Sequence, residues 1–303
     1  MRARSESSSA PGATQCRSGY RIALLVACLF PGAPSARPAE DPKEIVRQAL
    51  RNDTRNRELE RSYTYTLREE VRKLDSGNAV KSSESKTWEV IPLGGGPPFR
   101  RLIERDDRPL TPKEEQEQAA ARKKQEDERR KRQELRERET PEQRQKRLDA
   151  RERNKQRNLE QVDDIVNGFD LRLVGEEWID GMPVWVIDGE PHKGYKFHTR
   201  MVAAFAGKMK GRIWVTKDGR QAVRVDAETI DAITFGGFLA RINKGTRIHM
   251  EYTYVNGEAW LPKRETFSAS ARLLLLKGFH EEGESTFTNY KKFTTDSRII
   301  GDR

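Results

Sequence analysis

The sequence predicts an α+β protein that is mainly antiparallel β-sheet with covering helices. Two runs, Gln221–Glu228 and Arg247–Tyr254, alternate apolar with polar residues, which is the two-residue period of a strand with one face in water. The dipeptides Asp218-Gly219 and Asn256-Gly257 stand beside these runs and favour tight hairpin turns. Repeated along the chain, these signals predict about eleven strands.

The composition separates a folded domain from a charged segment. Only 34% of the 303 residues are hydrophobic, which is low for a globular chain. Residues 113–160 contain 17 Lys and Arg and 13 Asp and Glu, and they cannot bury enough apolar surface to form a core. We interpret 113–160 as a charged helical insertion in a single domain that comprises 40–112 and 161–303.

The net charge of +10 belongs to the insertion and to the first 39 residues. Without residues 1–39 and 113–160 the chain has 36 basic and 34 acidic residues. A nearly neutral domain lacks the basic surface that nucleic-acid binding needs. We therefore expect no nucleic-acid partner.

Residues 1–39 have the pattern of an export signal. Arg17 and Arg21 precede the apolar run Ile22–Phe30, and small residues follow at Ala33–Ser35, as at a signal-peptide cleavage site. The run is too short to span a bilayer. We expect cleavage near Ser35 or the next residue and release into the periplasm.

Two other interpretations of this leader remain open. Leu25–Cys28 resembles the lipobox that directs lipid attachment to a cysteine, here Cys28, and the segment could also remain uncleaved. Both cysteines of the chain, Cys16 and Cys28, lie in the leader. A processed domain therefore has no disulfide and no thiolate metal site.

The folded domain is predicted to begin with a helix from Asp41 to about Leu59. Asp41 suits the cap, Pro42 the first turn and Glu44 the capping-box position. One side of the helix is apolar, so we expect it to pack across the sheet. The residues on that side are Ile45, Val46, Ala49 and Leu50.

Three strands are predicted after this helix. Arg61–Val71 alternates, and a turn at Asp75–Asn78 leads into a partner strand that reaches Val90 or Ile91. A flexible connection with three glycines then precedes a third strand at Phe99–Glu104.

Two helix starts mark the insertion. Thr111–Glu114 and Thr140–Gln143 each combine a cap residue, a proline and Glu or Gln, which predicts helices over 112–139 and 141–160. Because neither helix has an apolar stripe, we interpret them as a solvated hairpin. An arm that contacts a partner or nucleic acid is the alternative, although interleaved acidic residues would repel phosphate.

The chain after the insertion is predicted to return to the sheet. Residues 162–169 continue the helix briefly, and strands at Asp170–Trp178 and Val184–Ile187 are joined by a turn at Asp180-Gly181. A short helix follows a polar loop, because Met201, Phe205 and Met209 recur at helical spacing. A meander of about six strands from Gly211 to Phe293 completes the domain.

The sequence offers few residues for catalysis. It contains no nucleophile elbow, no phosphate-binding glycine loop and no His-Glu-x-x-His pattern. His192 and His198 share a loop with Glu190, and His280 precedes two glutamates; such groups could bind a metal, but histidines near acids are common at surfaces. We expect no enzyme activity, no metal and no cofactor.

Apolar residues occur where a loop should be polar. Ile233–Ile242 joins two strands yet carries Phe235, Phe238, Leu239 and Ile242, and Arg272–Lys277 contains four consecutive leucines. Two interpretations are open: the sheet is covered on both sides by its own helices, or it has a groove for an apolar ligand.

The segments Gly211–Gly219 and Tyr252–Pro262, the latter ending in Trp260-Leu261-Pro262, resemble the LolA/LolB-like periplasmic lipoprotein carrier superfamily. They also resemble the lipid-sensing domain of RseB-like regulators and exported proteins of the outer-membrane lipoprotein-sorting type. The resemblance covers 41–112 and 161–299. It implies a half-open barrel with a helical lid that shields acyl chains without catalysis or cofactor. The charged insertion departs from the family pattern, and the carrier's lid-locking arginine has no match.

The resemblance implies a non-catalytic periplasmic protein that binds lipid or lipoprotein acyl chains, with a role in outer-membrane lipoprotein sorting. The alternative is an envelope sensor or scaffold protein that engages a partner through the charged insertion. The residues predicted to line the mouth of a lipid site are Met201, Phe205, Met209, Phe235, Phe238, Leu239 and Ile242.

Overall fold

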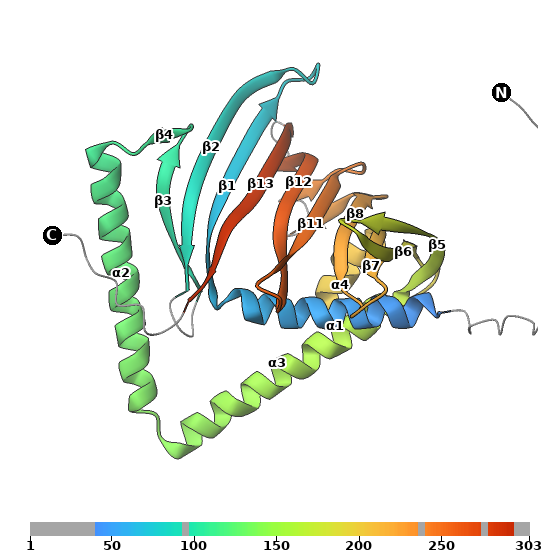
Figure 1. Cartoon of the computed structure of the whole chain (residues 1–303), viewed down its shortest axis with the longest axis horizontal. Helices are drawn as coiled ribbons and strands as arrows, with labels where there is room; N and C mark the ends of the chain where they lie inside the picture. The colour runs from blue at the N-terminus through green and yellow to red at the C-terminus, as the bar shows by residue number, and fades with distance from the viewer. Residues whose placement is uncertain (1–39, 93–96, 236–239, 274–277, 294–303) are drawn as a thin grey trace, which may run out of the picture. The chain divides into compact units, whose positions relative to one another are not determined.

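The computed structural model describes residues 40–92, 97–235, 240–273 and 278–293 (Figure 1). The chain divides into two compact units, Met1–Ala39 and Glu40–Arg303. Only the second unit is described, so the predicted export signal lies outside the described residues.

One antiparallel sheet dominates this unit. Its strands follow the order β4-β3-β2-β1-β13-β12-β11-β8-β7-β6-β5, and β10 pairs with both β12 and β9. The sheet does not close, so the predicted α+β fold with an open half-barrel is confirmed. In the described part of the chain the strands are β1 Tyr63–Leu74, β2 Val80–Ile91, β3 Phe99–Arg105, β4 Arg108–Pro109, β5 Phe169–Ile179, β6 Met182–Pro191, β7 Met209–Thr216, β8 Ala222–Thr229, β9 Ile233–Phe235, β10 Ala240–Ile242, β11 Arg247–Val255, β12 Ala259–Leu273 and β13 Gly278–Lys292.

Helix α1, Pro42–Glu60, begins as the sequence predicts. The Asp41 side chain accepts a hydrogen bond from the Lys43 backbone N–H, and proline occupies the first turn. Glu44 does not close a capping box. Its carboxylate instead accepts hydrogen bonds from Arg47 and from Gln48, one turn further along the same helix.

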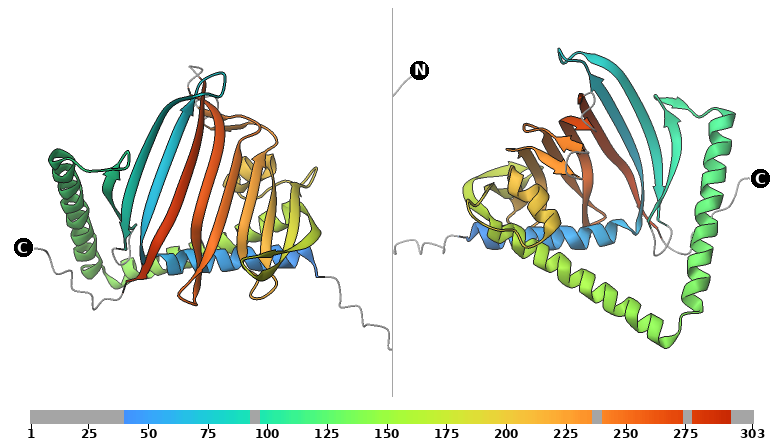
Figure 2. Two further views of the ribbon diagram at one scale, coloured as in Figure 1. Left: turned by 45° about the horizontal axis from the view of Figure 1, so that its top comes forward. Right: turned by 180° about the vertical axis from the view of Figure 1, so that it is seen from behind.

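Helix α1 packs across the sheet through the predicted apolar stripe. Ile45 and Ala49 are fully buried, together with Ile187 of β6 and Val215 of β7. Each such aliphatic side chain contributes roughly 1.5–3 kcal/mol by leaving water. In both views of Figure 2, α1 crosses the sheet near one end of its strands, so the core lies at that end.

Helices α2, Pro112–Glu137, and α3, Pro141–Gly168, form the charged segment. Both predicted capping boxes are present, at Thr111 with Glu114 and at Thr140 with Gln143. Helix α2 has no buried residue in its described length. The last turns of α3 belong to the core, where Val162 and Val166 pack with α1.

The two charged helices do not form a packed hairpin. From the turn between them they diverge in every view (Figures 1 and 2). Their side chains pair mainly within each helix, as in the Arg122–Glu126 ion pair. The domain boundary at 113–160 stays a prediction.

Three local expectations differ from the structure. The turn after β7 places positive φ at Gly219 and Arg220 rather than at Asp218 and Gly219. Helix α4, Arg200–Phe205, is short and gives way to a 3₁₀ turn, so Met209 begins β7 instead of ending a helix. The apolar segment 233–242 forms strands β9 and β10 at its two ends, whereas Phe238 and Leu239 lie outside the described residues.

Candidate functional site

The sheet has two chemically different faces, which the alternation of its strands separates. Ile213 and Val215 of β7 belong to the core that α1 covers. Arg212 precedes Ile213 in the strand, and Trp214 stands between Ile213 and Val215. Because side chains alternate along a strand, Arg212 and Trp214 point to the opposite side. We call the side of Ile213 and α1 the inner face and the side of Arg212 the outer face.

The strand register extends the inner face across the sheet, because residues paired between neighbouring strands point to the same side. Ile213 pairs with Val225, Val225 with Met250, and Met250 with Glu265. Continuing the pairing through β13, β1 and β2 takes this row to Ser285, Glu69 and Lys86, so the inner face is mixed. Apolar side chains of the same parity lie along it between these polar groups. These apolar side chains include Ile213, Val225, Ile248, Met250, Phe267, Phe279, Phe287, Leu67, Val71 and Trp88.

Part of the apolar surface on this inner face is open to solvent. Phe267 is 37% exposed and Phe279 is 36% exposed, although both lie on the same side as the α1 core. A Cβ added to Gly283 would lie 2.1 Å from Cε1 of Phe267, so the ring lies directly over this glycine. The absence of a side chain at Gly283 therefore sets the position of an exposed ring.

Two of the predicted lipid-site residues fall on the inner face. Met209 pairs with Thr229 and has the same strand parity as Ile213, and Ile242 pairs with Ala271, which has the parity of Phe267. Both side chains are half-buried. The register therefore places them on one surface, although they are far apart in sequence.

The other predicted lipid-site residues lie on α4, on β9 or outside the described residues. Phe205 ends α4 and is 37% exposed, and α4 contacts β9. Met201 belongs to α4 and Phe235 to β9, where its backbone pairs with that of Ala240. Whether these side chains contact a lipid stays a prediction.

Three tyrosines and two glutamates, Glu60 and Glu265, cluster on the inner face near the end of α1. The ring centroids of Tyr65 and Tyr290 are 5.0 Å apart, and the Tyr65 hydroxyl donates to Glu60 at 2.9 Å. Burial raises the pKa of Tyr252 to about 12. Burial, and then the charge of Glu60, raises the pKa of Glu265. These polar groups therefore lie in surroundings that disfavour charge.

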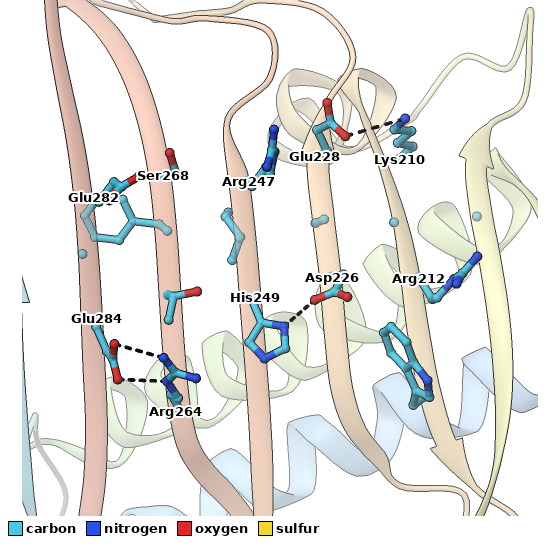
Figure 3. Close-up of a pocket in the computed structure, with 18 of the residues that line it drawn as sticks. Lys210, Arg212, Asp226, Glu228, Arg247, His249, Arg264, Ser268, Glu282 and Glu284 are labelled. Carbon is cyan, nitrogen blue, oxygen red and sulfur yellow. Dashed lines mark hydrogen bonds and ion pairs between the residues drawn. The ribbon is translucent and has the colours of Figure 1, made fainter. Parts of the chain in front are cut away.

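The charged side chains of the outer face line a groove of about 860 Å³, which Figure 3 shows. Ile248 and Phe267, which the strand register assigns to the inner face, are also among its lining residues. Its charged side chains pair across neighbouring strands. Arg264 donates to both oxygens of Glu284, at 2.9 and 3.1 Å. The His249 Nδ1 lies 2.5 Å from Asp226 Oδ1 (Figure 3). Further pairs join Arg212 to Asp188 and Lys210 to Glu228.

Many charges of the outer groove are paired in this way, but Glu190, Arg247 and Glu282 of its lining have no ion pair with another described residue. Arg264 lowers the pKa of Glu284, and Arg212 lowers the pKa of Asp188, because each guanidinium donates to the carboxylate. The Nε2 of His249 lies 3.1 Å from Glu251, so carboxylates occupy both ring nitrogens. None of the seven predicted lipid-site residues is among the described residues that line the groove.

Two of the three histidines considered as metal ligands, His192 and His198, make other contacts. His192 pairs with Asp170 at 2.7 Å, and His198 lies 3.1 Å from Asp164. Within the described ranges, no group of three or more His, Cys, Asp or Glu side chains is arranged to hold a metal ion.

Asp164 of α3 anchors the loop that precedes α4. Its carboxylate accepts hydrogen bonds from the Tyr195 hydroxyl and from the backbone N–H groups of His198 and Thr199, and its side chain is only 3% exposed. Burial opposes ionisation of Asp164, but the N–H groups of Thr199 and His198 outweigh burial and lower its pKa. In the sequence Asp164 stands next to Asp163 between Val162 and Val166, and nothing there distinguishes the buried aspartate from its more exposed neighbour.

No helix in the described ranges is long and apolar enough to cross a membrane.

No protein-family model matches the sequence, and a search of curated proteins finds no match. Among solved structures, the chain is similar to a putative outer membrane lipoprotein-sorting protein domain from Vibrio parahaemolyticus, with a TM-score of 0.32 and 8% identity over 86% of this chain and 96% of that one. It is also similar to a DUF1329 family protein from Desulfovibrio piger, with a TM-score of 0.31 and 12% identity over 85% and 96% of the two chains.

A LolA superfamily protein from Nitrosomonas europaea gives a TM-score of 0.26 and 12% identity, over 87% of this chain and 99% of that one. The LolA-like superfamily, which the sequence resembles, thus also occurs among the similar solved structures. At these TM-scores and identities, no ligand, partner or activity transfers to this chain.

Proposed function

We propose that this protein is a non-catalytic periplasmic binding protein whose inner face shields the acyl chains of a lipid or lipoprotein. The observation that carries the proposal is the solvent-exposed apolar part of that face, at Phe267 and Phe279. Monomeric proteins seldom leave contiguous apolar surface open unless it binds something. A face continued by strand pairing from β7 to β1 fits that description.

The extent of the inner face suits an acyl chain. Five strand spacings separate β7 from β1 along the sheet, which amounts to about 24 Å at roughly 4.8 Å per spacing. One leaflet of a bilayer, and so one extended acyl chain, measures about 15 Å. Each buried methylene would contribute roughly 0.8 kcal/mol, so binding needs no charged recognition group.

The predicted lipid-site residues have a definite place in this proposal. Met209 and Ile242 border the open part of the inner face by strand register, and Phe205 lies on the short helix that contacts β9. We assign Met201, Phe235 and the remaining predicted residues to the mouth of the same site. They would contact the ligand where it enters.

The proposed location rests on residues 1–39. The basic residues, short apolar run and small residues of that leader support export to the periplasm. A role in outer-membrane lipoprotein sorting would follow from acyl-chain binding in that compartment. Intact-mass measurement distinguishes soluble release, with a chain that starts near Ser35, from a lipoprotein that starts at Cys28 with added acyl mass.

A second candidate function is that of an envelope sensor or scaffold. It is favoured by α2, a helix of 26 residues with no buried residue in its described length and with charged side chains along it. Such a helix contributes little to the core, so engaging a protein partner would explain it. Deleting 113–157 should abolish this function and leave acyl-chain binding intact.

The experiment for acyl-chain binding combines native mass spectrometry with a fluorescent fatty-acid probe. We expect protein purified from its own envelope to retain a lipid, and Phe267→Ser to weaken probe binding by about 1–3 kcal/mol with little change in stability. The matched control is Trp178→Ser on β5, because Trp178 is 74% exposed and lies on the edge strand. A wild-type protein that binds no probe and retains no lipid would refute the proposal.

A further inference from the structure

A cleft separates the two helices that lie at the base of the sheet. Its volume is about 1030 Å³, and it is lined by one side of α1 and one side of α3. Pro92, Pro97 and Pro98 also belong to the lining. In the right view of Figure 2, α3 runs away from α1 beyond the point where the two helices meet.

The lining of this cleft is strongly basic. Arg51, Arg55 and Arg61 contribute from α1 and the residue after it, and Arg151 and Lys155 contribute from α3. Only two acidic residues, Glu58 and Glu152, share the lining. The cleft therefore has a net positive charge, in a domain that is nearly neutral apart from its charged helices.

Most cations of the cleft have no partner in the described part of the chain. Among the described residues, the side chains of Arg55, Arg61, Arg151 and Lys155 make no hydrogen bond or ion pair. Arg51 has one distant partner, Asp163, at 3.7 Å. Two cations of the outer groove, Arg212 and Arg264, instead each hold a carboxylate through two hydrogen bonds.

We propose that this cleft binds phosphate groups, which are carried either by an anionic lipid headgroup or by a soluble phosphate compound. Several like charges that face one cleft repel one another, and a multivalent anion removes that repulsion while it gains charge-assisted hydrogen bonds. Guanidinium groups match phosphate oxygens in pairs, and three of the four unpaired cations are arginines. The neutral side chains of Thr54, Asn154 and Asn158 supply further donors.

The dimensions allow more than one phosphate group. Arg51 and Arg61 stand ten positions apart along α1, which corresponds to about 15 Å. Leu159 and Val162 add apolar surface to the lining. This site is separate from the inner face, so phosphate binding does not depend on the proposed acyl-chain binding.

The test compares two triple variants of the full chain that lose the same charge. The cleft variant is Arg55→Gln, Arg151→Gln and Lys155→Gln. The control variant changes cations of the same helices that do not line the cleft, Lys43→Gln, Arg144→Gln and Arg153→Gln. Far-ultraviolet circular dichroism and denaturant unfolding should show that both variants fold as the wild type does.

Two probes distinguish the two phosphate sources. Sodium pyrophosphate is titrated calorimetrically, and sedimentation measures binding to vesicles of phosphatidylglycerol in phosphatidylcholine, with pure phosphatidylcholine as the neutral reference. We expect the wild type to bind at least one phosphate probe and the cleft variant to bind it about tenfold more weakly. The control variant should change binding by less than about twofold.

Each outcome decides the proposal. Loss confined to the cleft variant supports it, with pyrophosphate binding indicating a soluble source and vesicle binding alone indicating a lipid headgroup. Equal loss in both variants would show that only net charge matters and would overturn the site. Failure of the wild type to bind either probe would overturn it as well, whereas the fatty-acid result for Phe267→Ser would stand unaffected.

Discussion

The inner and outer faces come from the same strands, yet they differ in what remains for a ligand. On the outer face, charges such as Arg264 and Glu284 satisfy one another across neighbouring strands. On the inner face, apolar side chains continue past the region that α1 and α3 cover, and Phe267 stays partly exposed. A surface whose charges already pair with one another gains little free energy from binding a ligand. An uncovered apolar surface gains free energy when a ligand removes it from water.

The inner face is itself divided into a covered and an open part. Under α1, Ile187 is fully buried and packs against Ile45 and Ala49. Further along the sheet, Phe267 and Phe279 of the same face are exposed, whereas Leu67 is buried. The covered part should therefore determine stability and the open part should determine binding, and substitutions can separate these two roles.

The largest expected effect is in the covered part of the inner face. Ile187→Ala should lower the free energy of unfolding by about 2–5 kcal/mol, because it leaves a cavity in the α1 core. Arg212→Ala on the outer side of the next strand should cost less than about 1 kcal/mol. Urea denaturation of both variants measures the difference. Equal losses would mean that the two faces do not differ in the way described.

The next effect concerns a buried charge rather than a face. Asp164→Ala removes the acceptor for Tyr195, His198 and Thr199, so it should cost about 2–3 kcal/mol. Asp164→Asn keeps the size of the side chain and should cost less. A variant as stable as the wild type would show that the loop before α4 does not depend on this anchor.

The same anchor predicts a pH dependence. The pKa of Asp164 is lower in the folded state than in the unfolded chain, so its contribution is fully present above about pH 4. That contribution is lost as the pH falls through the folded-state pKa. The stability difference between wild type and Asp164→Asn, measured by thermal unfolding from pH 7 to pH 2.5, should shrink toward acid. A constant difference would contradict the assignment of an ionised Asp164.

Local patterns predicted much of the fold because the signals were local. The caps at Asp41, Thr111 and Thr140 and the turn at Asn256-Gly257 depend on residues within a few positions of one another, and the structure has each of them. The turn after β7 was displaced by one residue because Arg220, not Asp218, adopts positive φ. Propensity alone does not distinguish such neighbours.

The site was harder to predict, because it depends on register and on helix placement. Alternation indicated that each strand has two faces, but not which strands pair, so the row through Val225, Met250 and Glu265 was not visible. The basic cleft needs α1 and α3 side by side, although Arg55 and Arg151 are almost a hundred residues apart. Phe238 and Leu239 lie outside the described residues, so their predicted role is untested.

The open part of the inner face offers a smaller and more selective perturbation. Gly283→Val would place side-chain atoms where the Phe267 ring lies and displace it, at a cost of about 1–3 kcal/mol in unfolding free energy. The same variant should weaken fatty-acid probe binding, because the displaced ring no longer lies along the sheet. Gly175→Val on β5 is the control, since a Cβ there meets nothing within 4 Å. Unchanged probe binding in Gly283→Val would place the ligand elsewhere.

The smallest expected effect is on the outer face. Arg264 and Glu284 are 46% and 31% exposed, so solvent screens their attraction even though they share two hydrogen bonds. A double-mutant cycle with Arg264→Ala and Glu284→Ala should give a coupling energy of about 0.2–1 kcal/mol. The coupling should fall as salt rises from 0.05 to about 1 M, because the Debye length shortens to roughly 3 Å. It should also be lost in acid, as the pH falls through the folded-state pKa of Glu284, which Arg264 holds below the ordinary value of a glutamate. A coupling energy of several kcal/mol that does not fall with salt would mean that this pair is shielded from water. The outer face would then not be a solvent-exposed, self-paired surface, and the proposed difference between the two faces would be wrong.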